Sequence, residues 1–297
     1  MLDVQLVNIG DNGFFKIPKF KGLEKIVRFP DTETKRDSIP NSTVWIFNSH
    51  NHSYVPEILH NDAGCGMAAF IIEGDFELRH ATDKIYNQLN GKNILGRGNH
   101  FVDVCSGNEL SGGNNILLIH SDGKSIDTSV PQTIPEAKAK QQKAEYFRQE
   151  LGYNLAKKIG AKCSIMGNWT HNSVDQEDGK IIYRKGVIKT TPEKIYVLPA
   201  NLGEMVLFYI VDKENMPPCN SMPHATGRAG PRGDLKVTAE KAGLIRKVVY
   251  IPEKISNESL RSEYPSCYND FKPIFNAMGK YIVEIDEAQI LSYVGKI

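Results

Sequence analysis

Short apolar runs, each bounded by Gly, Asn, Pro or Asp, are the feature of this sequence that most restricts its fold. Runs of this kind that are rich in β-branched and aromatic residues are typical of β-strands. We expect strands at Val44–Phe47, Ala68–Ile72, Ile116–Ile119, Ile181–Tyr183, Ile195–Leu198, Val206–Val211, Val248–Ile251 and Tyr281–Ile285. Because the runs do not alternate regularly with helical segments, the sequence predicts an α+β fold rather than a doubly wound parallel sheet.

Helical periodicity is clear in one long segment, from about Pro135 to Ile159. Its apolar stripe has the i, i+4 spacing of a helix face and consists of Phe147, Leu151, Leu155 and Ile159. A capping-box pattern begins at Thr133, and Gly160 is placed to end the helix. A second, shorter helix is expected at Asp270–Met278, with its first residue left open by Pro273.

Composition and charge exclude several classes of protein. Of the 297 residues, 40% are hydrophobic, which excludes a disordered chain. The 36 Lys and Arg residues against 35 Asp and Glu residues give a net charge of +1. This balance excludes a generally basic nucleic-acid binder but allows a local basic groove. The longest apolar runs, such as Met205–Val211, are much shorter than the roughly 20 residues that a membrane-spanning helix needs.

The sequence has no internal repeat and no low-complexity linker, so we expect one domain over residues 1–297. The Gly- and Asn-rich stretch Gly107–Asn115 is interpreted as a long loop between two strands. Met1–Gly10 lacks the basic region of a secretory signal. The five cysteines are odd in number and irregularly spaced, unlike a disulfide framework. A reduced, cytoplasmic setting is therefore expected.

Residues that could carry chemistry gather in glycine-rich turns and at strand ends, where binding sites are usually built. They are Asp62 and Cys65 before the strand at Ala68, Asn99 and His100 after Gly98, His120 at the end of a strand, His171 and Asn172 after Trp169, and His224 before Gly227. Each has a plainer interpretation, because a single strand-end His is more often a hydrogen-bonded structural residue. A Gly-Cys-Gly segment is likewise more often a tight turn around a buried thiol.

If these side chains converge, they form a metal site. One carboxylate, one thiolate and several imidazoles suit a borderline divalent ion such as Mn²⁺, Zn²⁺, Co²⁺ or Fe²⁺. The candidates, namely Asp62, Cys65, His100, His120 and His171, are too many for one closed tetrahedral site. They are enough for two adjacent ions with the Cys65 thiolate as a bridge. Gly123-Lys-Ser125 is not a phosphate-binding P-loop, because Leu118 stands where that pattern needs its first glycine.

Taken in order along the chain, these segments resemble the motifs of the RtcB-type RNA-splicing ligases. The matching segments are Asp62-Ala-Gly-Cys-Gly66, Gly96-Arg-Gly-Asn-His-Phe-Val-Asp103, His120-Ser-Asp-Gly123, His171-Asn172, Arg184-Lys-Gly186, Pro199-Ala-Asn-Leu-Gly203 and His224-Ala-Thr-Gly-Arg228. Each motif alone is weak. Their unbroken order over residues 61–297 identifies the chain as a short, divergent relative of that family.

The resemblance implies an RtcB-like fold, in which mixed β-sheets with flanking helices surround a two-metal site. It implies an enzyme with two Mn²⁺ ions that joins RNA ending in a 2′,3′-cyclic phosphate or 3′-phosphate to RNA with a 5′-hydroxyl, in tRNA splicing or RNA repair. GTP is the energy source, and a histidine–GMP adduct is the intermediate. On the matching positions, Asp62, Cys65 and His100 hold one ion, and Cys65, His120 and His171 hold the other. His224 is the histidine that receives GMP.

The same resemblance implies a set of nucleotide contacts. They are Asn99, His100, Phe101, Val102, Asp103, His171, Asn172, Pro199, Ala200, Asn201, Leu202, Val206, His224, Ala225, Thr226, Gly227, Tyr268 and Lys296. Tyr268 matches an aromatic residue that stacks on guanine, and Lys296 matches a lysine that contacts the base. A neutral imidazole at His224 can attack the α-phosphorus of GTP once divalent ions neutralise the phosphate charge.

The sequence departs from the family pattern at several positions. Residues 1–60 match poorly, and the family's Asp-Val-His segment ahead of the cysteine turn is not evident. Pro-Gly-Ser-Met has become Pro-Ala-Asn-Leu, and His-Gly-Ala-Gly-Arg has become His-Ala-Thr-Gly-Arg, so Ala200 and Ala225 are expected to narrow the phosphate cradle. Asp103 replaces a Glu that binds guanine, and its reach is one methylene shorter.

Two other functions fit these residues. A metal-dependent phosphoesterase or nucleotidyltransferase would use the same site without ligation. A non-catalytic RNA- or nucleotide-binding module would have lost metal ligands that this sequence keeps. RNA binding is expected to use basic runs such as Lys180–Lys189 and Arg228–Lys236, with Arg184 and Lys185 as phosphate contacts; solvated surface lysines are the plainer interpretation.

Overall fold

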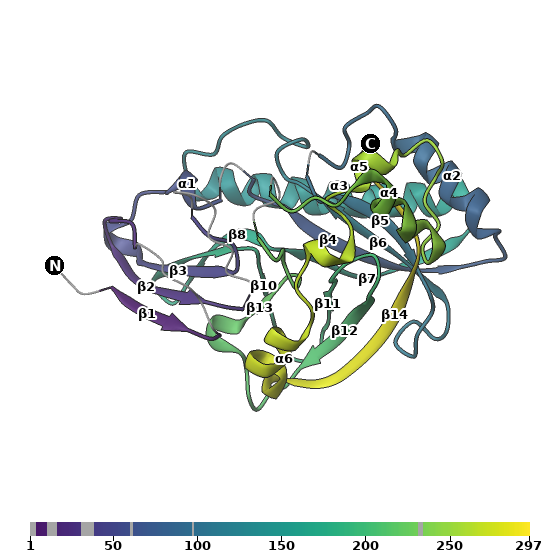
Figure 1. The fold of residues 1–297 in the computed structure, drawn as a ribbon. Coiled ribbons are helices and arrows are strands. Elements are labelled where there is room, and N and C mark those ends of the chain that lie inside the picture. Colours follow the sequence, from purple (N-terminus) through teal and green to yellow (C-terminus); the bar gives the residue numbers. More distant parts are fainter. Residues whose placement is uncertain (1–3, 11–16, 31–38, 60–61, 97, 231–233) are drawn as a thin grey trace.

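The computed structural model describes residues 4–10, 17–30, 39–59, 62–96, 98–230 and 234–297 (Figure 1). Its strands are β1 (Gln5–Asn8), β2 (Leu23–Arg28), β3 (Thr43–Asn48), β4 (Gly66–Glu73), β5 (Phe101–Cys105), β6 (Asn115–Ser121), β7 (Lys162–Thr170), β8 (Asn172–Glu177), β9 (Lys180–Lys185), β10 (Val187–Lys189), β11 (Ile195–Leu198), β12 (Met205–Val211), β13 (Ser221–Pro223) and β14 (Ile282–Gly295). The α-helices are α1 (Pro56–Leu59), α2 (Leu78–Leu89), α3 (Ile134–Ile159), α4 (Ala239–Gly243), α5 (Asn257–Leu260) and α6 (Lys272–Met278).

The described strands form three sheets. The largest is a seven-stranded antiparallel sheet in the order β11-β12-β14-β5-β6-β4-β7. A five-stranded sheet has the order β1-β2-β3-β9-β8, in which only the β1–β2 pair is parallel. A short antiparallel pair, β10-β13, completes the set. The expected α+β class is confirmed, and the described residues form a single domain.

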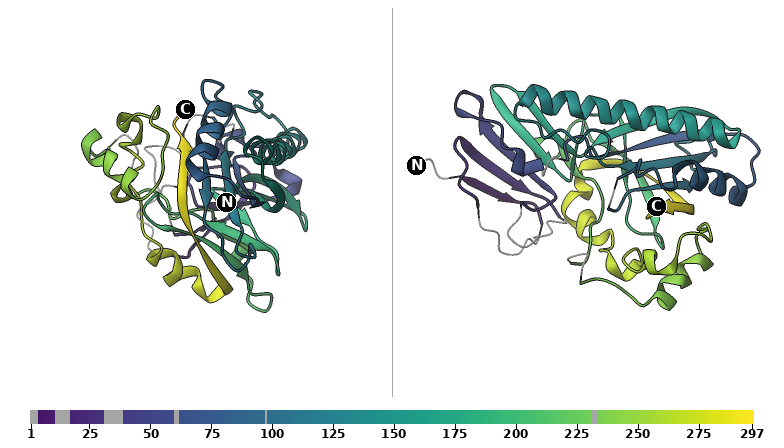
Figure 2. Two further views of the ribbon diagram at one scale, coloured as in Figure 1. Left: turned by 90° about the vertical axis from the view of Figure 1, so that its right-hand side faces the viewer. Right: turned by 90° about the horizontal axis from the view of Figure 1, so that it is seen from above.

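The long helix α3 begins and ends where its capping residues predicted. The Thr133 hydroxyl accepts a hydrogen bond from the amide of Glu136 at 3.3 Å, and Gly160 ends the helix with φ of +84°. The Glu136 carboxylate accepts from the amide of Gln132 at 2.8 Å, so the returning arm of the capping box reaches the residue before the cap. Figure 2 shows α3 lying along the large sheet, where it packs on β4 and β7, and the helix also contacts β8 of the five-stranded sheet.

Gly152 of α3 lies directly against the ring of Phe70 in β4, since a Cβ at this position would be 2.2 Å from Cε2 of the ring. We expect Gly152→Ala to lower the free energy of unfolding by about 1–3 kcal/mol. This is the opposite of the roughly 1 kcal/mol gain that Ala brings inside an exposed helix. Urea denaturation measures the change. In a Phe70→Leu background the loss should shrink, and an equal loss in both backgrounds would contradict the packing explanation.

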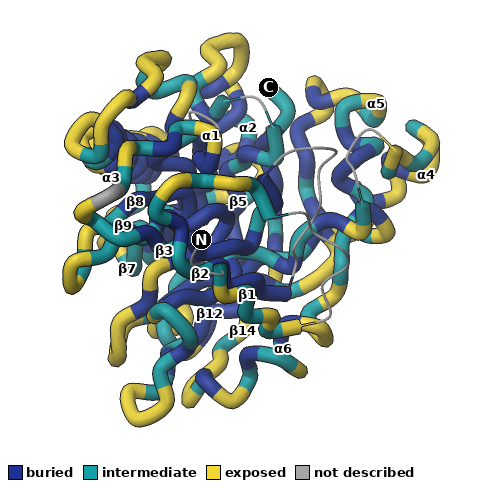
Figure 3. The backbone as a smooth tube through the Cα atoms, turned by 90° about the vertical axis from the view of Figure 1, so that its left-hand side faces the viewer, coloured by how far each residue is buried: buried dark blue, intermediate teal, exposed yellow. Residues whose placement is uncertain are grey.

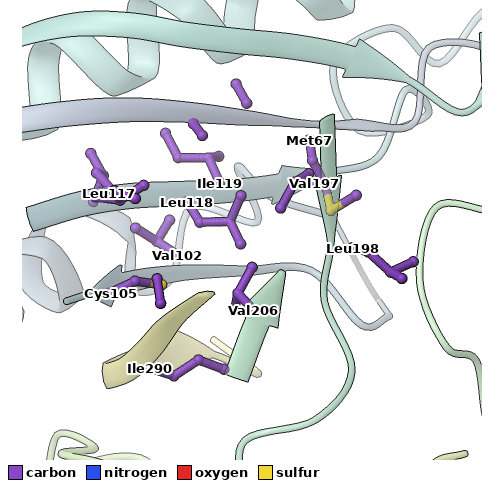
Figure 4. Packing of buried hydrophobic residues seen from close by; sticks show 14 of the residues in the cluster. Met67, Val102, Cys105, Leu117, Leu118, Ile119, Val197, Leu198, Val206 and Ile290 are labelled. Atoms are coloured by element: carbon purple, nitrogen blue, oxygen red, sulfur yellow. The ribbon is translucent and has the colours of Figure 1, made fainter. Parts of the chain in front are cut away.

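Buried apolar side chains pack on both larger sheets. Figure 3 shows long stretches of buried backbone in the interior of the molecule. One cluster includes Met67, Leu117 and Ile119 on the large sheet (Figure 4), and a second includes Trp45 and Tyr183 on the five-stranded sheet. Among the described residues, none of the helices combines the length and the apolar content needed to cross a membrane.

Most of the expected elements are confirmed. The runs at residues 44–47, 68–72, 116–119, 181–183, 195–198 and 206–211 lie in β3, β4, β6, β9, β11 and β12, and the Gly107–Asn115 stretch connects β5 to β6. The run near Tyr281 begins the much longer β14, and α6 covers the second expected helix from Lys272.

The strand expected at Val248–Ile251 is wrong. Its residues form only an isolated bridge between Tyr250 and Ser292, outside any named strand. Val249 and Ile251 are buried, whereas Val248 is 60% exposed. The alternating apolar residues therefore bury one side of an irregular segment, which contacts β14 through the hydrogen bonds of Tyr250 to Leu291 and Tyr293 but forms no ladder with it.

Candidate functional site

Four of the expected metal ligands lie at the same end of four neighbouring strands of the large sheet. Cys65 precedes β4 and His100 precedes β5, whereas His120 lies near the end of β6 and His171 follows β7. Neighbouring antiparallel strands run in opposite directions, so the start of one strand lies beside the end of the next. Because the order is β5-β6-β4-β7, the antiparallel pairing brings all four side chains together.

Backbone hydrogen bonds tie the Cys65 turn to the His171 segment. The amide of His171 donates to the carbonyl of Cys65 at 2.9 Å, and the amide of Gly64 donates to the carbonyl of Asn172 at 2.9 Å. The amide of Val187 in turn donates to the carbonyl of His171 at 3.0 Å, which links β10 to the same point. The position of Cys65 is thus determined by main-chain contacts as well as by its own turn.

The Cys65 sulfur lies among three imidazoles. Its Sγ is 3.2 Å from Nε2 of His171, 3.6 Å from Nε2 of His100 and 3.7 Å from Nε2 of His120. Cys65, His100 and His120 form a group whose ligand atoms all lie within 4.8 Å of one another. All four side chains are buried. Such a set of sulfur and nitrogen donors suits a borderline divalent cation.

Burial sets the charge state of this cluster. It lowers the pKa of His120 and of His171 well below the ordinary value, and the neighbouring histidines lower it further. Burial also raises the pKa of the Cys65 thiol. Neutral imidazoles are the form that binds metal, and a bound cation favours the thiolate. Nδ1 of His171 has no hydrogen-bond partner among the described residues, so no hydrogen bond at Nδ1 fixes the tautomer of the imidazole ring. The residues present therefore fit a metal ion.

Asp62 lies beside the cluster but is engaged elsewhere. Its Oδ1 accepts hydrogen bonds from the amides of Gly123 at 2.9 Å and Lys124 at 3.3 Å, and its Oδ2 accepts from Nδ2 of Asn172 at 3.4 Å. Asp62 lines the same cavity as Cys65 but is outside the Cys65–His100–His120 group. The structure thus brings four of the five expected ligands into direct contact and places the fifth nearby.

His224 lies against the His171 ring of the cluster. Its ring centroid is 4.1 Å from that of His171 and 6.4 Å from that of His120. Nδ1 lies 2.8 Å from the carbonyl oxygen of Gly186. Because a carbonyl only accepts, Nδ1 carries the proton, and Nε2 carries the lone pair of the neutral ring. The β10–β13 pairing determines this position, since His224 directly follows β13 and its amide donates to Gly186 at 3.3 Å.

The cluster opens into a cavity of about 310 Å³. Most of the residues expected to hold metal or nucleotide line it: Asp62, Cys65, Asn99, His100, Phe101, Asp103, His120, His171, Asn172, Pro199, Ala200, Asn201, Leu202, His224, Ala225, Gly227 and Tyr268. These residues come from segments far apart in the sequence, and the fold brings them together around one cavity.

Four expected nucleotide contacts lie outside the lining of this cavity, namely Val102, Val206, Thr226 and Lys296. Val102 and Val206 pack among the buried apolar side chains of the large sheet (Figure 4). Val102 alternates with Phe101 and Asp103 along β5, so its side chain faces the opposite side of the sheet. Thr226 is buried as well, and its amide donates to the carbonyl of Pro199 at 3.1 Å.

A second group of polar residues at the cavity is organised around Glu263. The Glu263 carboxylate accepts from Nη2 of Arg228 at 3.0 Å and from Nζ of Lys296 at 2.8 Å. It also accepts from the Tyr268 hydroxyl and from the Ser262 hydroxyl. The Arg228 guanidinium lies 4.5 Å from the centroid of the Tyr268 ring. Lys296 and Tyr268, expected as base contacts, are thus held together by this buried carboxylate.

Two further hydrogen bonds join these residues to the segment before β5. Oδ1 of Asn99 accepts from Nη2 of Arg228 at 2.5 Å, and Nζ of Lys296 donates to the carbonyl of Gly98 at 2.6 Å. Asp103 is buried, and its Oδ1 has no hydrogen-bond partner among the described residues. Burial and the nearby Glu263 carboxylate raise the pKa of Asp103. A ligand with hydrogen-bonding groups would satisfy this carboxyl.

Sequence reasoning misplaced or missed several residues. Arg184 is completely buried and ion-paired with Asp175 at 2.6 Å, so its interpretation as an RNA contact is wrong. Lys185 alternates to the other face of β9 and lines the cavity. Glu263 and Asn41 also line it and were not expected. No local pattern marks these two residues. Arg97 and residues 231–233 of the two expected basic and glycine-rich segments lie outside the described residues.

Comparison of the sequence with protein-family models and with curated proteins gives no match. Function is therefore inferred from the order of the sequence motifs and from the geometry of the cavity.

Proposed function

We propose that this chain is an RNA ligase of the RtcB type. It would join RNA ends bearing a 2′,3′-cyclic phosphate or 3′-phosphate to 5′-hydroxyl ends, with GTP as the energy source and two Mn²⁺ ions as cofactors. The observation that carries the proposal is the position of His224. The centroid of its ring lies 4.1 Å from that of His171, beside the Cys65 cluster. Its Nδ1 is hydrogen-bonded to the carbonyl of Gly186, which leaves the lone pair on Nε2. This is the arrangement that a histidine nucleophile beside a metal centre requires.

The chemistry of the proposed first step follows from this hydrogen bond. Nε2 of His224 attacks the α-phosphorus of GTP, a nitrogen–phosphorus bond forms, and the bond to the β-phosphate oxygen breaks to release pyrophosphate. The ring gains positive charge as it attacks, and the Gly186 carbonyl stabilises that charge through the Nδ1 proton. A 3′-phosphate needs a leaving group before a 5′-hydroxyl can displace it, and GMP transferred from His224 would supply one.

Divalent ions held by Cys65, His100, His120 and His171, with Asp62 beside them, would neutralise phosphate charge when bound. Lys185 is a buried cation that lines the same cavity and adds positive charge near the metal cluster. Asn172 lines the same cavity, and its side-chain amide can donate to phosphate without becoming a competing metal ligand. The residues on this side of the cavity therefore all suit an anionic ligand.

The part of the cavity around Glu263 has the features of a base-binding site. It offers the Tyr268 ring for stacking, and the Asp103 carboxyl as a hydrogen-bonding group. Guanine presents two adjacent donors on its Watson–Crick edge, which suits a carboxylate acceptor. These features support GTP as the nucleotide within the proposal.

The proposal is tested with α-³²P-labelled GTP and Mn²⁺. Purified protein should become labelled on denaturing gels and should then join a 3′-phosphate RNA to a 5′-hydroxyl RNA. Metal binding without any label transfer, combined with hydrolysis of phosphoesters, would instead favour the metal-dependent phosphoesterase that shares the same residues.

Glu263 provides a separate test of the base-binding site. We expect Glu263→Gln to raise the KM for GTP in the labelling reaction about tenfold or more, because it weakens charge-assisted hydrogen bonds to Arg228 and Lys296. Glu258→Gln is the matched control, since Glu258 is exposed and forms an ion pair with Arg261. Equal KM values for the two variants would show that this cluster does not organise the nucleotide site.

A further inference from the structure

The Cys65 turn rests on one face of α3. Gly64 has φ of +98°, and a Cβ there would lie 2.7 Å from Cβ of Ala144. A Cβ on Gly66 would lie 2.6 Å from the carbonyl oxygen of Trp169 in β7 and 2.7 Å from Nη2 of Arg148. Ala144 and Arg148 are four residues apart and thus share a helix face. Gly64 therefore allows the close contact with α3, and Gly66 allows close contacts with both β7 and Arg148.

Arg148 is the side chain that fastens this contact. It is completely buried, and its Nη1 donates to the carbonyl of Gly64 at 2.6 Å. Nε donates to Oδ1 of Asn168 at 3.0 Å, and Nη2 donates to the hydroxyl of Thr170 at 3.1 Å. Asn168 and Thr170 are themselves bonded to Glu145, at 2.8 and 2.6 Å. The guanidinium of Arg148 thus links the turn before Cys65 to the end of β7, directly before His171.

The acceptors of Arg148 are neutral. Its three hydrogen bonds go to a carbonyl, an amide and a hydroxyl, and among the described residues it forms no ion pair with a carboxylate. A buried cation without a counter-charge is strongly unfavourable. Burial accordingly lowers the pKa of Arg148 to about 10. The hydrogen bonds to Gly64, Asn168 and Thr170 therefore hold the guanidinium in the interior.

We propose that Arg148 is a positioning residue of the metal centre. It holds the Gly64–Cys65 turn against the end of β7, so that the sulfur and the His171 imidazole meet at a set distance. This inference rests on the metal site of the proposed function and is independent of the ligation reaction.

The experiment uses Co²⁺ as a spectroscopic probe of the metal-free protein. A cobalt–thiolate bond gives a charge-transfer absorption in the near ultraviolet, and titration gives the affinity. We expect Arg148→Lys, which keeps the charge but loses the planar set of donors, to weaken Co²⁺ binding about 10- to 100-fold and to change this band. Arg184→Lys is the matched control, because Arg184 is equally buried but contacts Asp175, Ser221 and Cys219 instead.

Urea denaturation of the metal-free variants separates positioning from stability. Both Arg→Lys proteins should lose stability, but only Arg148→Lys should lose cobalt affinity. Unchanged affinity and spectrum in folded Arg148→Lys would overturn the role of Arg148. Should that variant not fold, Thr170→Val, which removes one acceptor of the guanidinium, decides in the same way. A wild-type protein with no cobalt–thiolate band would instead refute the metal site and this inference together.

Discussion

His224→Ala protein is expected to form no covalent adduct with GMP, while it binds metal as the wild type does. The loss should be complete on denaturing gels, because the imidazole is the attacking group and alanine offers no substitute. The metal centre should survive, since His224 contacts the His171 ring but is not among the expected ligands. Label transfer from α-³²P GTP and metal analysis of the same preparation give the two measurements.

His80→Ala is the control for this variant. His80 lies on the exposed face of α2, and its loss should leave labelling unchanged. A histidine–phosphate bond is acid-labile and survives alkali, so the wild-type label should be lost at low pH. Continued labelling or RNA joining by His224→Ala protein would disprove the assigned nucleophile, whatever the state of the metal site.

Cys65→Ala protein is expected to lose metal from both proposed positions, because its sulfur lies within 3.7 Å of three imidazole nitrogens. Metal content by mass spectrometry should fall close to zero per chain after dialysis at micromolar free Mn²⁺ or Zn²⁺. Burial raises the pKa of the Cys65 thiol, and metal binding displaces its proton. Wild-type affinity should therefore increase with pH, and the Cys65→Ala variant should lack this contribution.

Cys105→Ala and Cys163→Ala are controls for the cysteine substitution. Cys105 is a buried residue of β5, and Cys163 is a half-buried residue of β7. Cys105→Ala should cost stability through a small cavity and leave metal content unchanged. Retention of two metal equivalents by Cys65→Ala protein would rule out the bridging role and would place the ions on the remaining residues.

Local sequence determined the elements whose physics is local. Capping by Thr133 and Gly160 sets the ends of α3 because side-chain and αL caps act within one turn. Apolar runs predicted most strands of the large sheet for a similar reason, since a buried strand needs apolar side chains whatever its partner. The α2 helix was missed although Ala81, Ile85 and Leu89 have the i, i+4 spacing of a helix face. The more polar strands β7 and β8 were missed because they lack the apolar runs of a buried strand and are completed by pairing with their neighbours.

The order of the motifs along the chain named most residues of the candidate site. It named Cys65, His100, His120, His171 and His224, and antiparallel pairing then placed them at one edge. The same motifs included Val102, which alternation along β5 turns into the core. A motif thus states which residues are near the site, and the pleat of the strand decides which of them face it.

Only the tertiary structure decided which charges serve the site. Arg184 and Lys185 are adjacent and both basic, yet one is ion-paired in the interior and the other lines the cavity. Arg148 and Glu263 have no local pattern that marks them, because the groups they bind come from distant segments. A buried charge is stable only where the folded chain supplies its partners, and those partners exist only once the sheets and α3 have packed together.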